Sequence, residues 1–495
     1  MVAISFVPLA GRLFSILLVS TVVFARPTPS ASQAQETDVN RLDASLPPDS
    51  LGLVTSGADG LYYTNITLGG LQLTVQLDTG SSDLVVNLQG RQLDVKNSTN
   101  VHVKAPYAQG EADGVVAFAD LQLGNITISN QAFMNVTDIT NLNTLGDGIL
   151  GVATTNGSVV FHTLINSLGE DAALRLGQSP MQSLFAQRSD LPATFDLQLG
   201  RSSTVGDVVP STFLIGEHDQ NFQQVVNAPQ LPSFSGAHWS ASMDRLTVNG
   251  QHLTLESTIL GEPGKAAAAL DTGFPFPLIP SAAVDAIYSS IPGAMRDPND
   301  DLGWVVPCNA TTNVSFVFAG QDFFVHPLDL SVPTITQVAA SDGTMQNSTI
   351  CINTFKGEVE MPEEFAGFTL ILGGAFLRNI YASFNLGDTQ AGVGPFVQMV
   401  STTPDLSAAV TEFLVKRAAA LATLPPVLDP AAFIAMAQTN GGDSQTPSAA
   451  SQTASSSATP TQGTQSTSSN GAAEPAIALD TMWLGAVMLS LAFVM

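Results

Sequence analysis

The stretch that decides the fold is residues 71–88, LQLTVQLDTGSSDLVVNL. Apolar side chains alternate along its first half, at Leu71, Leu73, Val75 and Leu77. This alternation predicts a strand with one buried face. The strand gives way to Asp78-Thr79-Gly80-Ser81-Ser82, where glycine permits a tight turn and two hydroxyls stand beside the acid. The sequence therefore predicts a carboxylate at the end of a buried strand.

A second copy lies at residues 266–280, AAAALDTGFPFPLIP, where an apolar run again leads into Asp271-Thr272-Gly273. The two aspartates are 271 − 78 = 193 residues apart. A repeat that long is too large for a solenoid unit, so it predicts two similar lobes that each supply one acid to a shared site. Neighbouring carboxylates share a proton, which leaves one as acid and one as base beside a water molecule. A single Asp-Thr-Gly is more often an ordinary turn, but two copies in the same apolar setting favour the shared site.

The first 25 residues read as a secretory signal. Arg12 precedes an apolar core at residues 13–24, and small residues stand before Arg26. The alternative, a transmembrane anchor, is weaker because the run is shorter than the ~20 residues needed to cross a bilayer. We expect residues 26–58 to form an N-terminal extension or a short prosegment.

Charge and motif content exclude several classes of protein. The chain carries 42 acidic against 16 basic residues, a formal net charge of −26, which disfavours nucleic acid as a partner. That acidity fits work at low pH and fits ordinary solubility equally well. The six histidines show no His-Glu-x-x-His spacing and no Gly-x-Ser-x-Gly is present, so we expect no metal and no other cofactor. The two cysteines, Cys308 and Cys351, predict one disulfide in a secreted chain.

Short apolar or alternating runs, punctuated by glycine, proline, asparagine and aspartate, extend from Leu61 to about Val400. This pattern predicts a mostly antiparallel all-β chain. Its length exceeds one comfortable core, which favours an N-terminal lobe at residues 59–225 and a C-terminal lobe at residues 226–400. N-glycosylation sequons lie in both lobes, at Asn65, Asn97, Asn125, Asn135, Asn156, Asn309, Asn313 and Asn347. Asn65, inside a strand-like segment, is a doubtful acceptor.

These motifs resemble the pepsin-like aspartic proteases, and the resemblance covers nearly the whole folded region. Besides the two Asp-Thr-Gly motifs, it is carried by DGILGVA at Asp147–Ala153, STFLIGEHD at Ser211–Asp219, HWSASMDRLTVNG at His238–Gly250 and the closing segment Leu370–Gly394. The cysteine pair falls where the family usually bridges its second lobe. The resemblance implies a bilobal fold with an active-site cleft between two related lobes.

The resemblance also implies roles for the motif residues. Asp78 and Asp271 would hold a water molecule and hydrolyse an internal peptide bond by general acid and base catalysis, without a covalent intermediate. The hydroxyls of Thr79 and Thr272 would brace the two loops, and Ser81 would support the first aspartate. Gly80 and Gly273 complete the two motifs.

The stretch Pro106–Leu123, PYAQGEADGVVAFADLQL, resembles the family's flap, a hairpin that closes over bound peptide. Tyr107 aligns with the flap tyrosine, and Gly110 and Gly114 keep the expected spacing. Without the resemblance, Tyr107 would read as an ordinary strand aromatic.

Three departures from the family pattern stand out. Phe274 follows the second Asp-Thr-Gly where the family usually has threonine or serine, so we expect the dyad to titrate at higher pH. Val85 stands where the family often has a tryptophan that touches the flap tyrosine. Residues 26–60 contain only Arg26 and Arg41 as basic residues, unlike the lysine-rich prosegments of many relatives.

The C-terminal part of the chain changes composition twice. Alanine-rich segments within residues 401–440 predict helices that either pack on the second lobe or form a stalk. Residues 441–470 are rich in serine and threonine and predict an extended, O-glycosylated spacer. Small residues near Asn470 and an apolar end at 482–495 predict a glycosylphosphatidylinositol signal, removed from residue 471 onward, with Asn470 or a neighbour as attachment point. A short tail anchor is the alternative, but 14 apolar residues are too few to span a bilayer.

The sequence therefore predicts a monomeric aspartic endopeptidase, resembling fungal enzymes that are tethered to the plasma membrane or cell wall. It would act on peptides or proteins at acidic pH and sit on the outer membrane leaflet through its lipid. The competing hypothesis is a catalytically weak or inactive member that binds peptides or serves as a wall glycoprotein, and Phe274 is its main support. A purely structural mannoprotein is a third possibility, which gives no reason for the ordered motifs.

Overall fold

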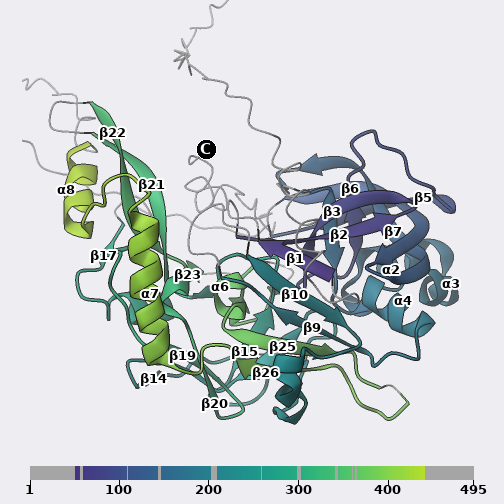
Figure 1. Cartoon of the computed structure of the whole chain (residues 1–495). Coiled ribbons are helices and arrows are strands. Elements are labelled where there is room, and N and C mark those ends of the chain that lie inside the picture. Colours follow the sequence, from purple (N-terminus) through teal and green to yellow (C-terminus); the bar gives the residue numbers. More distant parts are fainter. Residues whose placement is uncertain are drawn as a thin grey trace, which may run out of the picture.

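The computed structural model describes residues 51–55, 60–108, 110–142, 146–201, 209–257, 259–297, 303–339, 344–358, 361–362, 365–388 and 390–440 (Figure 1). The expected signal peptide, almost all of the expected prosegment, the Ser/Thr-rich spacer, Asn470 and the tail lie outside these residues.

Strands dominate the described residues, and the largest sheet runs through both halves of the chain. Its 13 described strands follow the order β11, β26, β25, β9, β10, β1, β2, β3, β8, β4, β7, β6, β5. Their bounds are β11 Leu231–Pro232, β26 Phe396–Ser401, β25 Ile380–Asn385, β9 Thr194–Gln198, β10 Pro210–Ile215, β1 Leu51–Thr55, β2 Tyr62–Leu68, β3 Leu71–Asp78, β8 Gly148–Gly151, β4 Leu84–Val86, β7 Ile126–Thr140, β6 Glu111–Leu123 and β5 Asn97–Pro106.

Strand β3 is the strand predicted from residues 71–77, and its last residue is Asp78. It pairs antiparallel with β2 through a turn at Gly69 and Gly70, whose φ angles of 50° and 78° favour glycine. Leu73, Val75 and Leu77 are buried in the main core. The alternating side chains thus point into the main core, and Thr74 and Gln76 between them are buried as well, so the end of β3 is buried on both faces.

Helices cover the first half on one side of its sheet. The described elements are η1 Thr155–Gly157, α2 Val159–Leu168, α3 Glu170–Leu176 and α4 Pro180–Gln187. Figure 1 shows α2, α3 and α4 beside the blue strands β5 and β7. Helix α2 begins at Ser158, whose side chain accepts a hydrogen bond from the amide of Phe161. Val160, Phe161 and Leu164 form the buried face of this helix.

The second half holds three smaller sheets. The first orders β12 Ser240–Met243, β15 Ala266–Leu270, β24 Leu370–Leu372, β16 Leu278–Pro280 and β23 Lys356–Glu358. The second orders β14 Gln251–Leu253, β13 Arg245–Val248, β19 Val314–Phe318 and β20 Gln321–Phe324. The third orders β17 Met295–Arg296, β18 Trp304–Val306, β22 Met345–Asn353 and β21 Ser331–Ala339. Between them lie η2 Gln220–Asn227, α5 Ser281–Tyr288, η3 Pro327–Asp329 and α6 Gly374–Leu377.

The two strands that lead into the aspartates, β3 and β15, pair with their neighbours in the same pattern. Strand β3 pairs in parallel with β8, and β8 pairs antiparallel with β4, the strand that follows the first motif. Strand β15 pairs in parallel with β24, and β24 pairs antiparallel with β16, the strand that follows the second motif. The repeat in sequence is thus a repeat in strand pairing.

Strands from the end of the chain close the large sheet onto the first half. Strand β25 pairs antiparallel with β9 over five residues, from Tyr381 opposite Gln198 to Asn385 opposite Thr194. An aromatic cluster lies at this junction, where the ring of Phe195 stacks on Phe384 with centroids 4.9 Å apart. The junction buries these rings and ties the two halves together.

The alanine-rich segments form α7 Leu406–Leu421 and α8 Pro430–Asn440, and both pack on the second half. Phe413 is fully buried, and Phe433 and Ile434 of α8 lie in a core cluster with residues of the third small sheet. Figure 1 shows α7 in yellow-green along the long β21–β22 hairpin. These contacts decide between the two alternatives in favour of packing rather than a free stalk.

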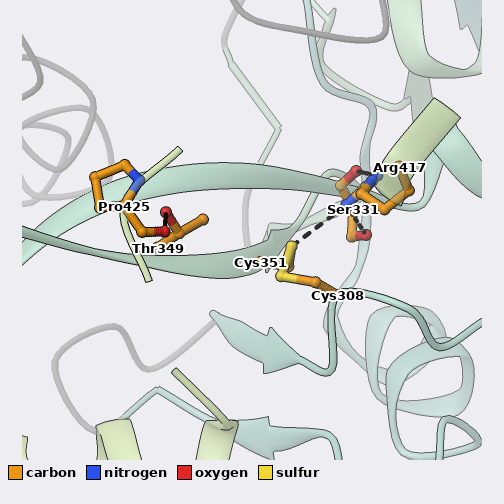
Figure 2. Close-up of a disulfide and its surroundings, with 6 residues drawn as sticks. All are labelled: Cys308, Ser331, Thr349, Cys351, Arg417 and Pro425. Atoms are coloured by element: carbon orange, nitrogen blue, oxygen red, sulfur yellow. Dashed lines mark hydrogen bonds between the residues drawn. A yellow bond between two sulfur atoms is a disulfide. The ribbon is translucent and has the colours of Figure 1, made fainter. Parts of the chain in front are cut away.

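The predicted disulfide is confirmed, because Cys308 and Cys351 are bonded beneath α7 (Figure 2). Arg417 of α7 is only 2% exposed, and its guanidinium donates to the Ser331 carbonyl at 2.7 Å and contacts Cys351 Sγ at 3.3 Å. The Thr349 hydroxyl donates to the carbonyl of Pro425 at 2.8 Å. No helix in the described ranges is long and apolar enough to span a membrane.

Candidate active site

The first aspartate of the pair is held by its own turn. Asp78 is 6% exposed, and its Oδ1 accepts a hydrogen bond from the Gly80 amide at 2.9 Å. The Ser81 hydroxyl donates to Oδ2 at 2.6 Å. These two donors fix the orientation of the carboxylate.

The second aspartate has a matching amide but a different side chain beside it. Asp271 is 2% exposed, and its Oδ1 accepts from the Gly273 amide at 2.7 Å. Phe274 occupies the place that Ser81 has in the first motif, three residues after the acid. Its ring packs edge to face with that of Phe365, with centroids 5.9 Å apart, so an apolar side chain stands where the first loop has a hydroxyl.

The two carboxylates come together across the motif glycines. A Cβ added to Gly80 would overlap the Asp271 carboxylate. A Cβ added to Gly273 would lie 2.6 Å from Asp78 Oδ1 and 2.9 Å from Asp271 Oδ1, so these two oxygens are at most the sum of those distances, 5.5 Å, apart. Only glycine fits at either position, because each lies against the carboxylate of the other loop.

The two threonines that the sequence singles out cross between the loops. The Thr79 hydroxyl donates to the Leu270 carbonyl at 2.8 Å and accepts from the Thr272 amide at 2.9 Å. The Thr272 hydroxyl donates to the Leu77 carbonyl at 2.7 Å and accepts from the Thr79 amide at 3.0 Å. Both threonines are fully buried. This reciprocal set of bonds fixes the two loops relative to each other.

The expected flap is a hairpin of β5 and β6. At its turn the Tyr107 amide donates to the Gly110 carbonyl at 2.9 Å, and Gly110 has a φ of 81°. Tyr107 packs against a cluster that contains buried Val85. Burial raises the pKa of Tyr107 well above its ordinary value, and the charges of Asp83 and Asp78 raise it further. The hydroxyl therefore stays protonated near the dyad.

The sequence analysis missed another buried carboxylate, Asp83, which lies five residues after Asp78. Its side chain accepts from the Ser158 hydroxyl and from the Val159 amide at 2.7 Å, at the start of α2. Burial raises its pKa to about 6, although these hydrogen bonds act in the opposite direction. The signal was available: an acid inside the apolar run that follows the first motif needs a buried partner.

Most of the predicted glycosylation sites are open to solvent. Six of the eight asparagines are exposed: Asn97, Asn125, Asn156, Asn309, Asn313 and Asn347. Asn65 is half-buried in β2 and its Oδ1 accepts from the Thr74 hydroxyl at 2.8 Å. Asn135 is also half-buried, in β7.

No group of three or more histidine, cysteine, aspartate or glutamate side chains within the described ranges is arranged to hold a metal ion. The candidate site is a pair of buried carboxylates on two loops that are hydrogen-bonded to each other.

Comparison with known proteins identifies the family. A sequence model of the eukaryotic aspartyl protease family matches residues 61–396. The chain belongs to this family of aspartic-type endopeptidases. The matched range contains both Asp-Thr-Gly motifs, the expected flap and the disulfide of this aspartyl protease, but it ends before α7 and α8.

Relatives of this aspartyl protease come from animals and fungi. It is 26% identical to pepsin A of Rhinolophus ferrumequinum over 361 residues, which cover 68% of this chain and 81% of the relative. It is also 26% identical to vacuolar protease A of Aspergillus fumigatus over 365 residues, which cover 69% of this chain and 80% of the relative.

A solved structure shows the same fold. The aspartic proteinase from Irpex lacteus superimposes with a TM-score of 0.53 at 18% sequence identity, covering 72% of this aspartyl protease and 97% of that chain. The predicted all-β pepsin-like fold is therefore confirmed.

Proposed function

We propose that this aspartyl protease hydrolyses internal peptide bonds with a water molecule held between Asp78 and Asp271. The observation that carries the proposal is the meeting of both carboxylates at Gly273, 2.6 Å and 2.9 Å from one added Cβ position. Two carboxylates this close share one proton, which provides a base and an acid at one site. The crossed bonds of Thr79 and Thr272 support the proposal, since they hold the pair before substrate arrives.

The reaction proceeds through a tetrahedral intermediate. The unprotonated carboxylate takes a proton from the water, whose oxygen attacks the scissile carbonyl carbon, while the protonated partner donates its proton to the carbonyl oxygen. When the carbon–nitrogen bond breaks, the leaving nitrogen takes one proton and one hydroxyl of the intermediate returns its proton to the pair. The carbonyl group re-forms as the new carboxyl end, and the dyad recovers its single shared proton.

The working pH follows from this shared proton. The dyad is active only while the pair holds one proton, and two close carboxylates reach that state at acidic pH. The flap residue Tyr107, beside Asp78 and Asp83, would close over the peptide and exclude bulk water from the reaction.

Cleavage of a diverse peptide library at pH 3 to 7 tests the proposal, with the purified protein beside Asp78→Asn and Asp271→Asn variants. We expect cleavage within the peptides by the wild type and loss of activity by several orders of magnitude in both variants. Cleavage that survives either substitution would rule out the dyad.

The presence of Phe274 favours a second candidate, a folded protein that binds peptides and cleaves them weakly. In that case the library assay shows little cleavage, and Phe274→Thr, which returns a hydroxyl beside Asp271, raises the rate. An acidic limb of the pH–rate profile that is the same in wild type and Phe274→Thr would contradict the expected effect of Phe274 on the dyad.

We further propose that the protein passes through the secretory pathway and is held on the outer leaflet by a glycosylphosphatidylinositol lipid near Asn470. The disulfide supports an oxidising compartment, and the apolar end supports the lipid signal. Treatment of intact cells with a phosphatidylinositol-specific phospholipase C should release the protein. A protein without residues 482–495 should appear in the medium, and its retention on cells would contradict the proposal.

A further inference from the structure

A short segment at the start of the second half, residues 233–240, contacts the loop of the first aspartate. The Nδ1 atom of His238 lies 2.8 Å from the carbonyl oxygen of Gly80. A carbonyl oxygen only accepts, so Nδ1 carries the proton and donates. The amide of Gly80 donates to Asp78, and its carbonyl accepts from His238, so both polar groups of this glycine are bonded.

The neighbouring tryptophan makes a second contact on the other side of the same loop. Trp239 Nε1 donates to the Val152 carbonyl at 3.1 Å, and the Val152 amide donates to the Asp78 carbonyl at 2.9 Å. The carbonyl of Trp239 accepts from the amide of Leu270, the residue before Asp271, at 2.9 Å. Residues 238 and 239 therefore touch the chain beside both acids.

The position of His238 is fixed by its surroundings. Its amide donates to the Ser235 hydroxyl at 3.1 Å, and its carbonyl accepts from the Ser233 hydroxyl at 3.1 Å. Its ring stacks on buried Phe365, with centroids 4.5 Å apart and planes 29° apart. Hydrogen bonds thus fix the backbone of His238, and the stack on Phe365 fixes its imidazole ring.

Phe365 continues this contact to the second aspartate. The rings of Phe274 and Phe365 meet edge to face, with centroids 5.9 Å apart and planes at 81°, and Phe274 is the third residue after Asp271. A line of packed rings from Phe274 through Phe365 to His238 ends on the Gly80 carbonyl. In the second motif, Phe274 stands in the place of Ser81 and is the first ring of this line of contacts to the first loop.

We propose that His238 is a positioning residue for the dyad, which holds the Gly80 turn against the second lobe through its Nδ1–H, with Phe365 and Phe274 as its support. This inference rests on the proposed function of the dyad. A loop that is less firmly held misplaces Asp78 relative to Asp271, so the turnover of bound peptide falls while peptide binding is little changed.

The test compares, in the full chain, two substitutions whose side chains have the same branched shape and the same number of heavy atoms. His238→Asn keeps an N–H donor and His238→Leu does not, while both lose the ring stack on Phe365. We expect kcat to stay within about threefold of wild type in His238→Asn and to fall about 10-fold to 100-fold in His238→Leu, with KM within about twofold. His162→Leu is the matched control, because His162 is an exposed histidine whose Nε2 also contacts a backbone carbonyl, that of Asn156.

Hydrogen exchange of the peptide that covers residues 78–86 reports on the loop even if no peptide is cleaved. We expect faster exchange in His238→Leu than in His238→Asn, and no change in His162→Leu. If the wild type cleaves nothing but these exchange rates differ as expected, the proposed function fails and the positioning role stands. Equal kcat and equal exchange in the two His238 variants would overturn the positioning role.

Discussion

At the scale of single residues, the crossed threonines are the connection on which the site depends most directly. The Thr79 hydroxyl satisfies one buried carbonyl and one buried amide at once. Thr79→Val keeps the shape but leaves both groups unpaired, at about 1–3 kcal/mol each. We expect the free energy of unfolding to fall by about 2–5 kcal/mol and the peptidase rate to fall with it, as measured by urea unfolding and peptide cleavage.

The serine variant is the control for this prediction. Thr79→Ser loses a methyl group and keeps the hydroxyl, so it should unfold within about 1 kcal/mol of wild type. A Thr79→Val protein that is as stable and active as Thr79→Ser would show that the hydrogen bonds across the loops contribute nothing.

At the scale of elements, α7 behaves as part of the second lobe although it lies beyond the family-matched range. Phe413 of α7 is fully buried, whereas its neighbour Leu414 is 48% exposed. Phe413→Ala should lower the free energy of unfolding by about 3–5 kcal/mol, because it leaves a cavity in a packed core. Leu414→Ala should change it by about 0.5 kcal/mol or less. Equal effects of the two substitutions in thermal or urea unfolding would mean that the helix is a detachable stalk.

The elements also show how far the sequence alone could lead. The strand before Asp78 and the helices within residues 401–440 follow from local sequence patterns, and the disulfide follows from the presence of two cysteines. The hairpin of β5 and β6 is expected only from the resemblance to the aspartic proteases. The face by which α7 packs does not follow, because its buried residues include the charged Arg417 beside Ala409, Phe413 and Ala420. Asp83 and His238 escaped prediction because their partners, Ser158 and Gly80, are 75 and 158 residues away.

At the scale of the whole molecule, two buried groups give stability opposite dependences on pH. Burial raises the pKa of Asp83 to about 6, so its contribution is full below the ordinary value of 3.8 and is lost as pH rises through 6. Burial lowers the pKa of His326 from 6.5 to about 4, so its contribution is full above 6.5 and is lost as pH falls through 4. Each of these two pKa changes corresponds to about 3 kcal/mol of stability. Because the contributions of Asp83 and His326 change in opposite directions with pH, they largely cancel between pH 4 and 6.

Removing either side chain should reveal the pH dependence of stability that the other one contributes. Asp83→Asn keeps polar atoms for the start of α2. In the wild type, Nδ1 of His326 accepts a hydrogen bond from the Leu328 amide at 3.1 Å, and His326→Asn keeps an acceptor for that amide. On going from pH 6 to pH 4, relative to wild type, Asp83→Asn should lose about 3 kcal/mol of stability and His326→Asn should gain about as much. Urea unfolding in an Asp78→Asn background, which prevents self-digestion, measures both. Parallel pH dependences in the three proteins would contradict the prediction.

The pairing of β9 with β25 has a consequence for synthesis on the ribosome. Strand β9 ends at Gln198 and β25 begins at Ile380, so the partner of β9 is translated about 180 residues later. At about 5–20 residues per second this delay is roughly 10–40 s, during which the newly made first half presents an open strand edge with unpaired amides and carbonyls. Until the last strands emerge and close the sheet, that edge is open to pairing with another chain.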